Sequence, residues 1–195
     1  MAGRGVRVTG GELCGRRLLG PARGVRPTAD RVRESLFARL GDLAGAAVLD
    51  LYAGTGVMGV EAVSRGAARV VFVERSPQVL ATLRDNLAAL SLDAEVEVLR
   101  GDACRWVRRL GEAGECFDLV LLDPPYESDE LPKALAALAE AQVVAPQGTL
   151  VVEHRRRHPV TVASEWATLD EWSYGETQVT RLGPSGHRGA GGSDS

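Results

Sequence analysis

Short apolar segments alternate with amphipathic segments through the centre of the chain. The apolar segments are rich in Val and Leu, as is typical of strands buried inside a sheet. Between them, apolar residues recur every three or four positions, which is typical of helices. The expected strands are residues 46–51, 69–74, 95–98, 117–122 and 149–153, and the expected helices are residues 57–64, 77–90, 105–110 and 131–141. This alternation predicts an α/β fold, a mainly parallel sheet with helices on both faces.

The amino-terminal segment, residues 1–27, is an arm rich in Gly and Arg. Within it, residues 6–8 and 17–19 are separated by glycines and are expected to pair as a small hairpin. Pro27-Thr28 is expected to start a helix, because Thr28 is a plausible N-cap and Asp30 favours the dipole of the first turn.

The carboxyl-terminal part is less regular. Residues 160–162 and 178–182 have the composition of strands and flank residues 166–172. The last segment is rich in Gly and Ser and is expected to be disordered. We therefore expect three regions, which are the arm at residues 1–27, one domain at residues 28–182 and a tail at residues 183–195.

The sequence Asp123-Pro124-Pro125-Tyr126 directly follows one of the expected strands. Ligand sites of open α/β sheets lie at this end of the strands, and the two prolines stiffen the loop. An exocyclic amino group of a nucleobase is a poor nucleophile, because its lone pair is delocalised into the ring. The Asp123 carboxylate and the Pro124 carbonyl can accept its two N–H bonds and free that lone pair. Stacking on Tyr126 returns roughly 1–3 kcal/mol, against a few kcal/mol for extruding the base.

The three residues Asp-Pro-Pro alone are explained about equally well as a structural turn after a strand that takes no part in catalysis. The aromatic fourth residue and the buried strand before it favour the functional interpretation. Asp123, Pro124, Pro125 and Tyr126 are therefore the candidate catalytic residues.

A glycine loop, Gly54-x-Gly56-x-x-Gly59, follows the first expected strand. It fits the dinucleotide fingerprint, and Glu74 lies near the position of a ribose-binding acid, so a nicotinamide dehydrogenase is a real alternative. However, Asp50 immediately before the loop would repel a pyrophosphate and suits the ammonium end of S-adenosylmethionine. A dehydrogenase also has no need of the Asp-Pro-Pro-Tyr sequence. We therefore favour an S-adenosylmethionine-dependent methyltransferase.

Four successive strand ends carry an acidic residue, and parallel strands place these ends at one edge of the sheet. Glu74 is expected to accept hydrogen bonds from the ribose hydroxyls, while Asp102 or the Ala103 backbone meets the adenine amino edge. Gly54 and Gly56 let the backbone approach the cofactor without a Cβ atom. The predicted cofactor residues are Asp50, Ala53, Gly54, Thr55, Gly56, Glu74, Arg75, Asp102 and Ala103.

The net charge of −3 conceals an uneven distribution. Residues 1–39 hold nine Arg against three acidic residues, a charge of +6, whereas the remainder holds 14 basic and 23 acidic residues, a charge of −9. A basic arm on an acidic body indicates a polyanionic partner, although a solvated charged surface explains the same pattern.

Other classes of protein find little support in the composition. Three Cys and three His are widely spaced, so we expect no metal site. No apolar run approaches the roughly 18 residues of a membrane span, and the first residues contain no apolar stretch of the kind found in signal peptides. We expect a cytoplasmic protein that acts as a monomer without contact to a membrane.

Three further stretches of the sequence are distinctive: Arg26-Pro27-Thr28-x-Asp30-Arg31-Val32-Arg33-Glu34, the opening Arg7-Val8-Thr9-Gly10-Gly11 and the closing Tyr174-Gly175-x-Thr177. Together with Asp-Pro-Pro-Tyr they resemble the RsmD family, the bacterial 16S rRNA (guanine-N2)-methyltransferases, and the first stretch is the most specific of them. One departure is Cys14, where a basic residue is common. The similarity runs from about residue 7 to residue 181.

The resemblance implies a class I S-adenosylmethionine-dependent methyltransferase fold, with a seven-stranded sheet and an antiparallel last strand. It implies methyl transfer to guanine N2 of 16S rRNA, within an assembled or assembling small ribosomal subunit. The expected RNA contacts are Arg7, Arg16, Arg17, Arg26, Thr28 and Arg31. The residues alone leave three alternatives open: a methyltransferase for adenine N6, one for a glutamine amide, or a binding protein that has lost catalysis.

Overall fold

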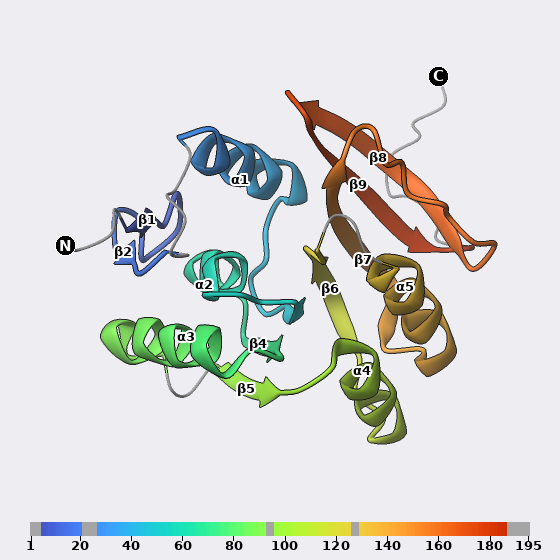
Figure 1. The fold of residues 1–195 in the computed structure, drawn as a ribbon, viewed down its shortest axis with the longest axis horizontal. Coiled ribbons are helices and arrows are strands. Elements are labelled where there is room, and N and C mark those ends of the chain that lie inside the picture. Colours follow the sequence, from blue (N-terminus) through green and yellow to red (C-terminus); the bar gives the residue numbers. More distant parts are fainter. Residues whose placement is uncertain (1–4, 21–26, 93–95, 126–128, 187–195) are drawn as a thin grey trace.

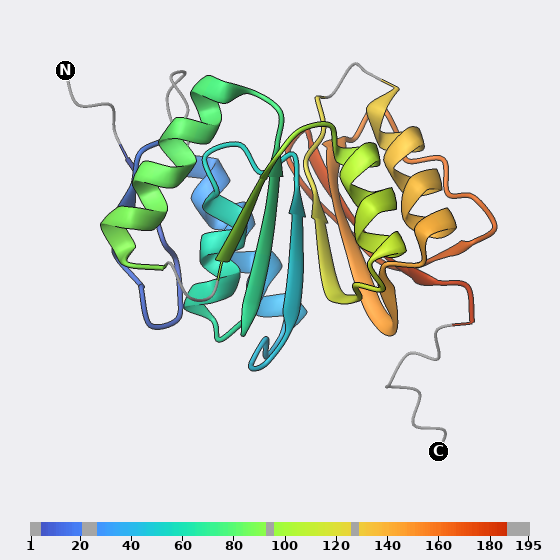
Figure 2. The same cartoon turned by 90° about the horizontal axis from the view of Figure 1, so that it is seen from below.

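A computed structural model describes residues 5–20, 27–92, 96–125 and 129–186. Its main feature is a sheet in the order β5-β4-β3-β6-β7-β9-β8. The strands are β3 (Ala47–Leu51), β4 (Arg69–Glu74), β5 (Val96–Arg100), β6 (Phe117–Leu122), β7 (Val144–Arg155), β8 (Trp166–Tyr174) and β9 (Thr177–Pro184). The first five are parallel, while β9 runs antiparallel between β7 and β8. The parallel strands therefore all end at the same edge of the sheet (Figure 2).

Helices cover both faces of this sheet (Figure 1). One face packs on α1 (Pro27–Leu40), α2 (Val57–Ser64) and α3 (Pro77–Leu90), and the other packs on α4 (Ala103–Glu112) and α5 (Glu130–Ala141). Side chains alternate between the two faces along each strand. Two buried cores result, because the central strands are apolar at almost every position.

The described part of the arm, residues 5–20, contains the predicted hairpin, formed by β1 (Val6–Arg7) and β2 (Arg17–Leu18). The hairpin packs against the rest of the protein, because Val8 and Leu18 are buried in the same core as α1, α2 and α3. Asn86 of α3 fixes the end of β2. Its side chain accepts a hydrogen bond from Leu19 N (2.7 Å) and donates one to Leu19 O (3.0 Å).

A buried carboxylate joins the hairpin, α1 and α2. Glu61 of α2 is fully buried, and its oxygens accept hydrogen bonds from Thr9 N (2.8 Å) and Thr9 Oγ1 (2.6 Å). They also accept from Arg33 Nε of α1 (3.2 Å) and Arg65 Nε (3.0 Å). Arg33 is itself 5% exposed and donates in addition to Arg7 O and Asp30. Both charges of the Arg33–Glu61 pair are therefore compensated inside the protein.

All the expected strands and helices of the central alternation are present, with shifted ends in several cases. The prediction for residues 160–162 is wrong, since they form no strand, whereas residues 166–172 belong to β8. Pro159 has no N–H to donate to a ladder, and Val160 and Val162 instead pack beside the core that contains α5. The last strand, β9, also continues to Pro184, two residues beyond the expected end of the domain.

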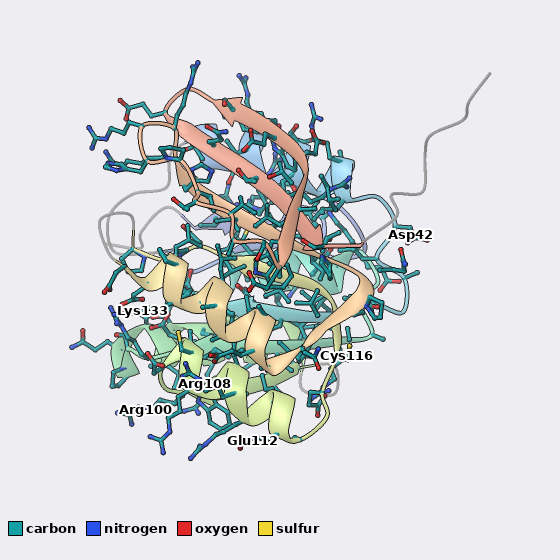
Figure 3. All side chains as sticks on the ribbon, turned by 90° about the vertical axis from the view of Figure 1, so that its right-hand side faces the viewer. Asp42, Arg100, Arg108, Glu112, Cys116 and Lys133 are labelled. Atoms are coloured by element: carbon teal, nitrogen blue, oxygen red, sulfur yellow. The ribbon has the colours of Figure 1, made fainter. Side chains whose placement is uncertain are left out.

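We predict that Glu61→Ala lowers the free energy of unfolding by about 3–5 kcal/mol, because it removes the fully buried carboxylate that pairs with the buried Arg33 guanidinium and with Arg65. Urea denaturation measures this difference. Glu112→Ala serves as the control, since Glu112 is exposed on the outer side of α4 (Figure 3), and it should change the value by less than about 0.5 kcal/mol. Equal effects of the two substitutions would contradict the role given to Glu61.

Candidate active site

The carboxyl ends of β3, β4, β5 and β6 surround a pocket of about 360 Å³, a volume within the range of small-molecule sites. Seven of the predicted site residues line it: Glu74, Arg75, Asp102, Ala103, Asp123, Pro124 and Pro125. The structure thus brings the acids after β4, β5 and β6 together, as their positions at the strand ends predicted.

The glycine loop is joined to this pocket through Glu74, which accepts a hydrogen bond from Gly54 N. Gly54 and Gly56 have positive φ angles of 57° and 84°, which other residues adopt at a cost. A Cβ atom at Gly56 would also collide with Leu83 of α3, and one at Gly59 would collide with Phe72 of β4. The glycines therefore allow both the turn and the close packing of α2 on the sheet.

Asp50 does not line the pocket, although we expected it to meet the cofactor. It is 3% exposed, and its Oδ2 accepts a hydrogen bond from Gly59 N (2.9 Å). Asp50 therefore holds the start of α2 against β3. Burial raises the pKa of Asp50 to about 7, against the lowering effect of the Gly59 hydrogen bond, and the Glu74 carboxylate raises it further.

Glu74 and Asp102 both shape the loops around the pocket. Glu74 accepts hydrogen bonds from Gly54 N (3.0 Å) and Ser76 N (2.7 Å), so it ties the glycine loop to the start of α3. Asp102 is the N-cap of α4 and accepts from Arg105 N (2.9 Å). A carboxylate has about four acceptor positions, so each of these groups retains the capacity to bind a ligand.

Asp123 directly follows β6 and lines the pocket, where part of its surface is open to solvent. Its carboxyl group is nevertheless surrounded largely by protein atoms, and this loss of hydration raises its pKa well above the ordinary value. The carboxylates of Glu153 and Asp50 raise the pKa of Asp123 further. Pro124 beside it is buried. An acidic group in this setting gains from a ligand that brings hydrogen-bond donors or positive charge.

Two predicted site residues, Tyr126 and Arg26, lie outside the described residues, and so does the side chain of Thr28. Ala53 and Thr55 belong to the glycine loop and do not line the pocket, and Thr55 O accepts a hydrogen bond from Asn86 (2.9 Å). Among the predicted RNA contacts, the side chains of Arg7, Arg16, Arg17 and Arg31 are exposed.

The sequence analysis missed Val73 and Gly101 of the pocket lining, and it also missed three residues with polar side chains at the site. Tyr52 lines the pocket with a φ angle of 62°, rare for a residue other than glycine, and Glu130 of α5 pairs with Arg75 (2.6 Å) at the same pocket. Glu153 lies near enough to Asp123 to raise its pKa. The signal for Glu153 was available, because it is the acid at the end of the expected fifth strand.

Every helix in the part of the chain that the structure describes is too short or too polar to span a bilayer. Within the same part of the chain, no group of three or more His, Cys, Asp or Glu side chains is arranged to hold a metal ion.

Comparison with known proteins identifies the family. A family described as "Conserved hypothetical protein 95" matches residues 6–182. Ribosomal RNA small subunit methyltransferase D of Haemophilus influenzae is 33% identical over 173 residues, which cover 87% of this chain and 89% of the relative. The protein of the same name from Escherichia coli K12 is 33% identical over 165 residues, covering 83% of this chain and 81% of the relative. The chain belongs to the RsmD family.

A solved structure agrees with this assignment. "Putative methyltransferase yhhF from Escherichia coli" matches with a TM-score of 0.81 and 31% identity, covering 92% of this chain and 98% of the other. The expected fold class, that of the class I S-adenosylmethionine-dependent methyltransferases, is confirmed, and S-adenosylmethionine is the cofactor of that class. The nicotinamide dehydrogenase alternative is therefore set aside.

We predict that Asp50 makes the unfolding free energy depend on pH. Its pKa is raised on folding, so the folded protein keeps a proton that the unfolded chain releases, and stability falls as the pH rises from about 4 to about 7. The slope from this group is at most about 1.4 kcal/mol per pH unit.

Asp50→Asn keeps an acceptor for Gly59 N but does not titrate, so it should show a shallower dependence. Urea denaturation of both proteins at several pH values between about 5 and 8 measures the difference. Parallel curves would mean that Asp50 does not titrate in this range.

Proposed function

We propose that this RsmD-family protein transfers a methyl group from S-adenosylmethionine to the N2 amino group of a guanine in 16S rRNA. The observation that carries the proposal is the single pocket at which Glu74 and Asp102 meet the Asp123-Pro124 segment. Two acids suited to an adenosine and a carboxylate–carbonyl pair suited to an amino group thus lie around one space. The names of the relatives support rRNA of the small subunit as the substrate.

The cofactor end of the pocket would be formed by β4 and β5. Glu74 would accept hydrogen bonds from the ribose hydroxyls, and Asp102 with the Ala103 backbone would meet the adenine edge. The hydrogen bonds that Glu74 already makes to Gly54 and Ser76 fix its carboxylate before binding, which lowers the ordering cost. The bound sulfonium supplies the electrophilic methyl group.

The acceptor end would be formed by β6 and the loop that follows it. Asp123 and the Pro124 carbonyl would accept the N–H bonds of the amino group and direct its lone pair toward the methyl carbon. Tyr126 would stack on the extruded base. Positioning and fixed dipoles would supply most of the acceleration, and proton loss from nitrogen would follow toward the Asp123 carboxylate.

The hairpin would bring RNA to this edge of the sheet. Arg7, Arg16, Arg17 and Arg31 are exposed, and guanidinium groups suit phosphate. We expect the protein to act as a monomer in the cytoplasm, on a free or a protein-bound rRNA.

A transfer assay with labelled S-adenosylmethionine tests this function and the role of Asp123. Small ribosomal subunits lacking the modification, naked 16S rRNA and DNA are offered in parallel. The wild-type protein should label at least one of the two RNA substrates and leave DNA unlabelled. Label on DNA alone would overturn the rRNA assignment.

In the same assay, Asp123→Ala should lower turnover by roughly 10²–10³, by analogy with the loss of one preorganised polar contact. Asp42→Ala is the matched control, because Asp42 precedes β3 at the opposite edge of the sheet (Figure 3) and should leave turnover unchanged. Wild-type turnover in Asp123→Ala would refute the catalytic assignment.

We predict that the double substitution Arg16→Gln and Arg17→Gln weakens RNA binding and flattens its dependence on salt. A protein that contacts fewer phosphates releases fewer counterions when it binds RNA. Filter binding at several salt concentrations measures the slope. Arg108→Gln, which changes an exposed arginine of α4 (Figure 3), should leave the slope unchanged. If the double variant keeps the wild-type slope, the arginines of the hairpin do not contact phosphate.

A further inference from the structure

A second acidic side chain lies next to Asp123 on the neighbouring strand. β6 and β7 are parallel, and Leu122 pairs with Val152 across the ladder. Asp123 and Glu153 are each one residue further along, at a strand spacing of roughly 4.8 Å. Alternation places Glu153 on the same face of the sheet as Val151, the face covered by α1, α2 and α3.

Each of the two acids borders a pocket. Pro124 and Pro125 line the cofactor pocket described above and also a second pocket of about 360 Å³, which Glu153 borders as well. Glu153 is half-buried. The two pockets therefore adjoin at Pro124 and Pro125, with Asp123 lining the first and Glu153 lining the second.

Two adjacent carboxylates repel each other, and the Glu153 charge acts on Asp123 in addition to its desolvation. A ligand edge that presents two neighbouring donors would relieve this repulsion. The Watson–Crick edge of guanine does so with N1–H and the N2 amino group. Adenine and 2-aminopurine instead present an acceptor at N1, which a carboxylate would repel.

We infer that Glu153 selects guanine by accepting the N1–H bond while Asp123 binds the N2 amino group. This assignment rests on the proposed function and adds a residue that determines its specificity. Flipped bases are read at the Watson–Crick edge by hydrogen bonds, and a site that hydrogen-bonds a polar group rejects analogues that lack it.

The test uses small subunits reconstituted with 16S rRNA that carries either guanosine or 2-aminopurine riboside at the methylated position. 2-Aminopurine keeps the N2 amino group but has an acceptor at N1. The wild-type protein should methylate the guanosine particle about 10- to 100-fold faster in kcat/KM, as expected for one good recognition contact. Glu153→Gln should lose most of this preference, since an amide can either accept or donate at N1.

Two variants and one binding measurement separate specificity from structure. Glu176→Gln removes the same charge from the exposed β8–β9 turn and should keep the wild-type preference. Glu153→Asp keeps a carboxylate and should keep the preference at a lower rate. All variants should bind S-adenosylhomocysteine as the wild type does. If Glu153→Gln does not fold, Glu153→Ala replaces it and must also lose the preference.

The outcomes distinguish the inference from the proposed function. Equal wild-type rates on the two particles, or an unchanged preference in Glu153→Gln, would overturn the role of Glu153 and leave methylation of guanine standing. Failure of the wild-type protein to methylate guanine N2 in any particle would overturn the proposed function, and the inference with it.

Discussion

The parallel direction of β3 to β7 is the constraint on which the site depends. Parallel strands release their chains at one edge, so residues far apart in the sequence meet there without further adjustment. Tyr52, Glu74, Asp102 and Asp123 follow or end four different strands and line one pocket. Because β3, β4 and β6 are buried on both faces, the two cores fix their register, and this register also fixes the positions of the polar residues at their ends.

The fold also uses polar groups to hold the loops of the site in place. Asp50 holds the start of α2 through Gly59, and Glu74 joins the glycine loop to α3. Glu61 performs a similar task at the hairpin, where it accepts hydrogen bonds from Thr9, Arg33 and Arg65. The basic hairpin is thereby fixed to the body of the protein, so any RNA that it binds is held in a defined relation to the sheet.

Much of this arrangement follows from the sequence. Runs of Val and Leu identified the strands, and acids at strand ends indicated the pocket. Prediction failed where neighbours in space decide the outcome. The residues next to Asp50 in the sequence do not reveal that its carboxylate will accept a hydrogen bond from Gly59 N. Those next to Arg33 do not reveal that it will pair with the buried Glu61, 28 residues away.

The carboxyl-terminal hairpin illustrates the same limit. Residues 160–162 have strand composition, yet the proline before them and the packing of their side chains keep them out of the sheet. Residues 166–172 have mixed composition but pair with β9 on both sides of a register shift between Thr168 and Asp170. Pairing between strands compensates for a weak local pattern, and the sequence of one segment does not contain that information.

The nature of the methylated nucleoside tests the central claim most directly. Ribosomal small subunits lacking the modification are treated with the protein and S-adenosylmethionine, digested to nucleosides, and analysed by mass and chromatographic retention. The account predicts N2-methylguanosine as the product. N6-methyladenosine would retain the fold and the role of Asp123 but contradict the guanine assignment, and an unmodified digest from a protein that binds the cofactor would contradict the proposed reaction on rRNA.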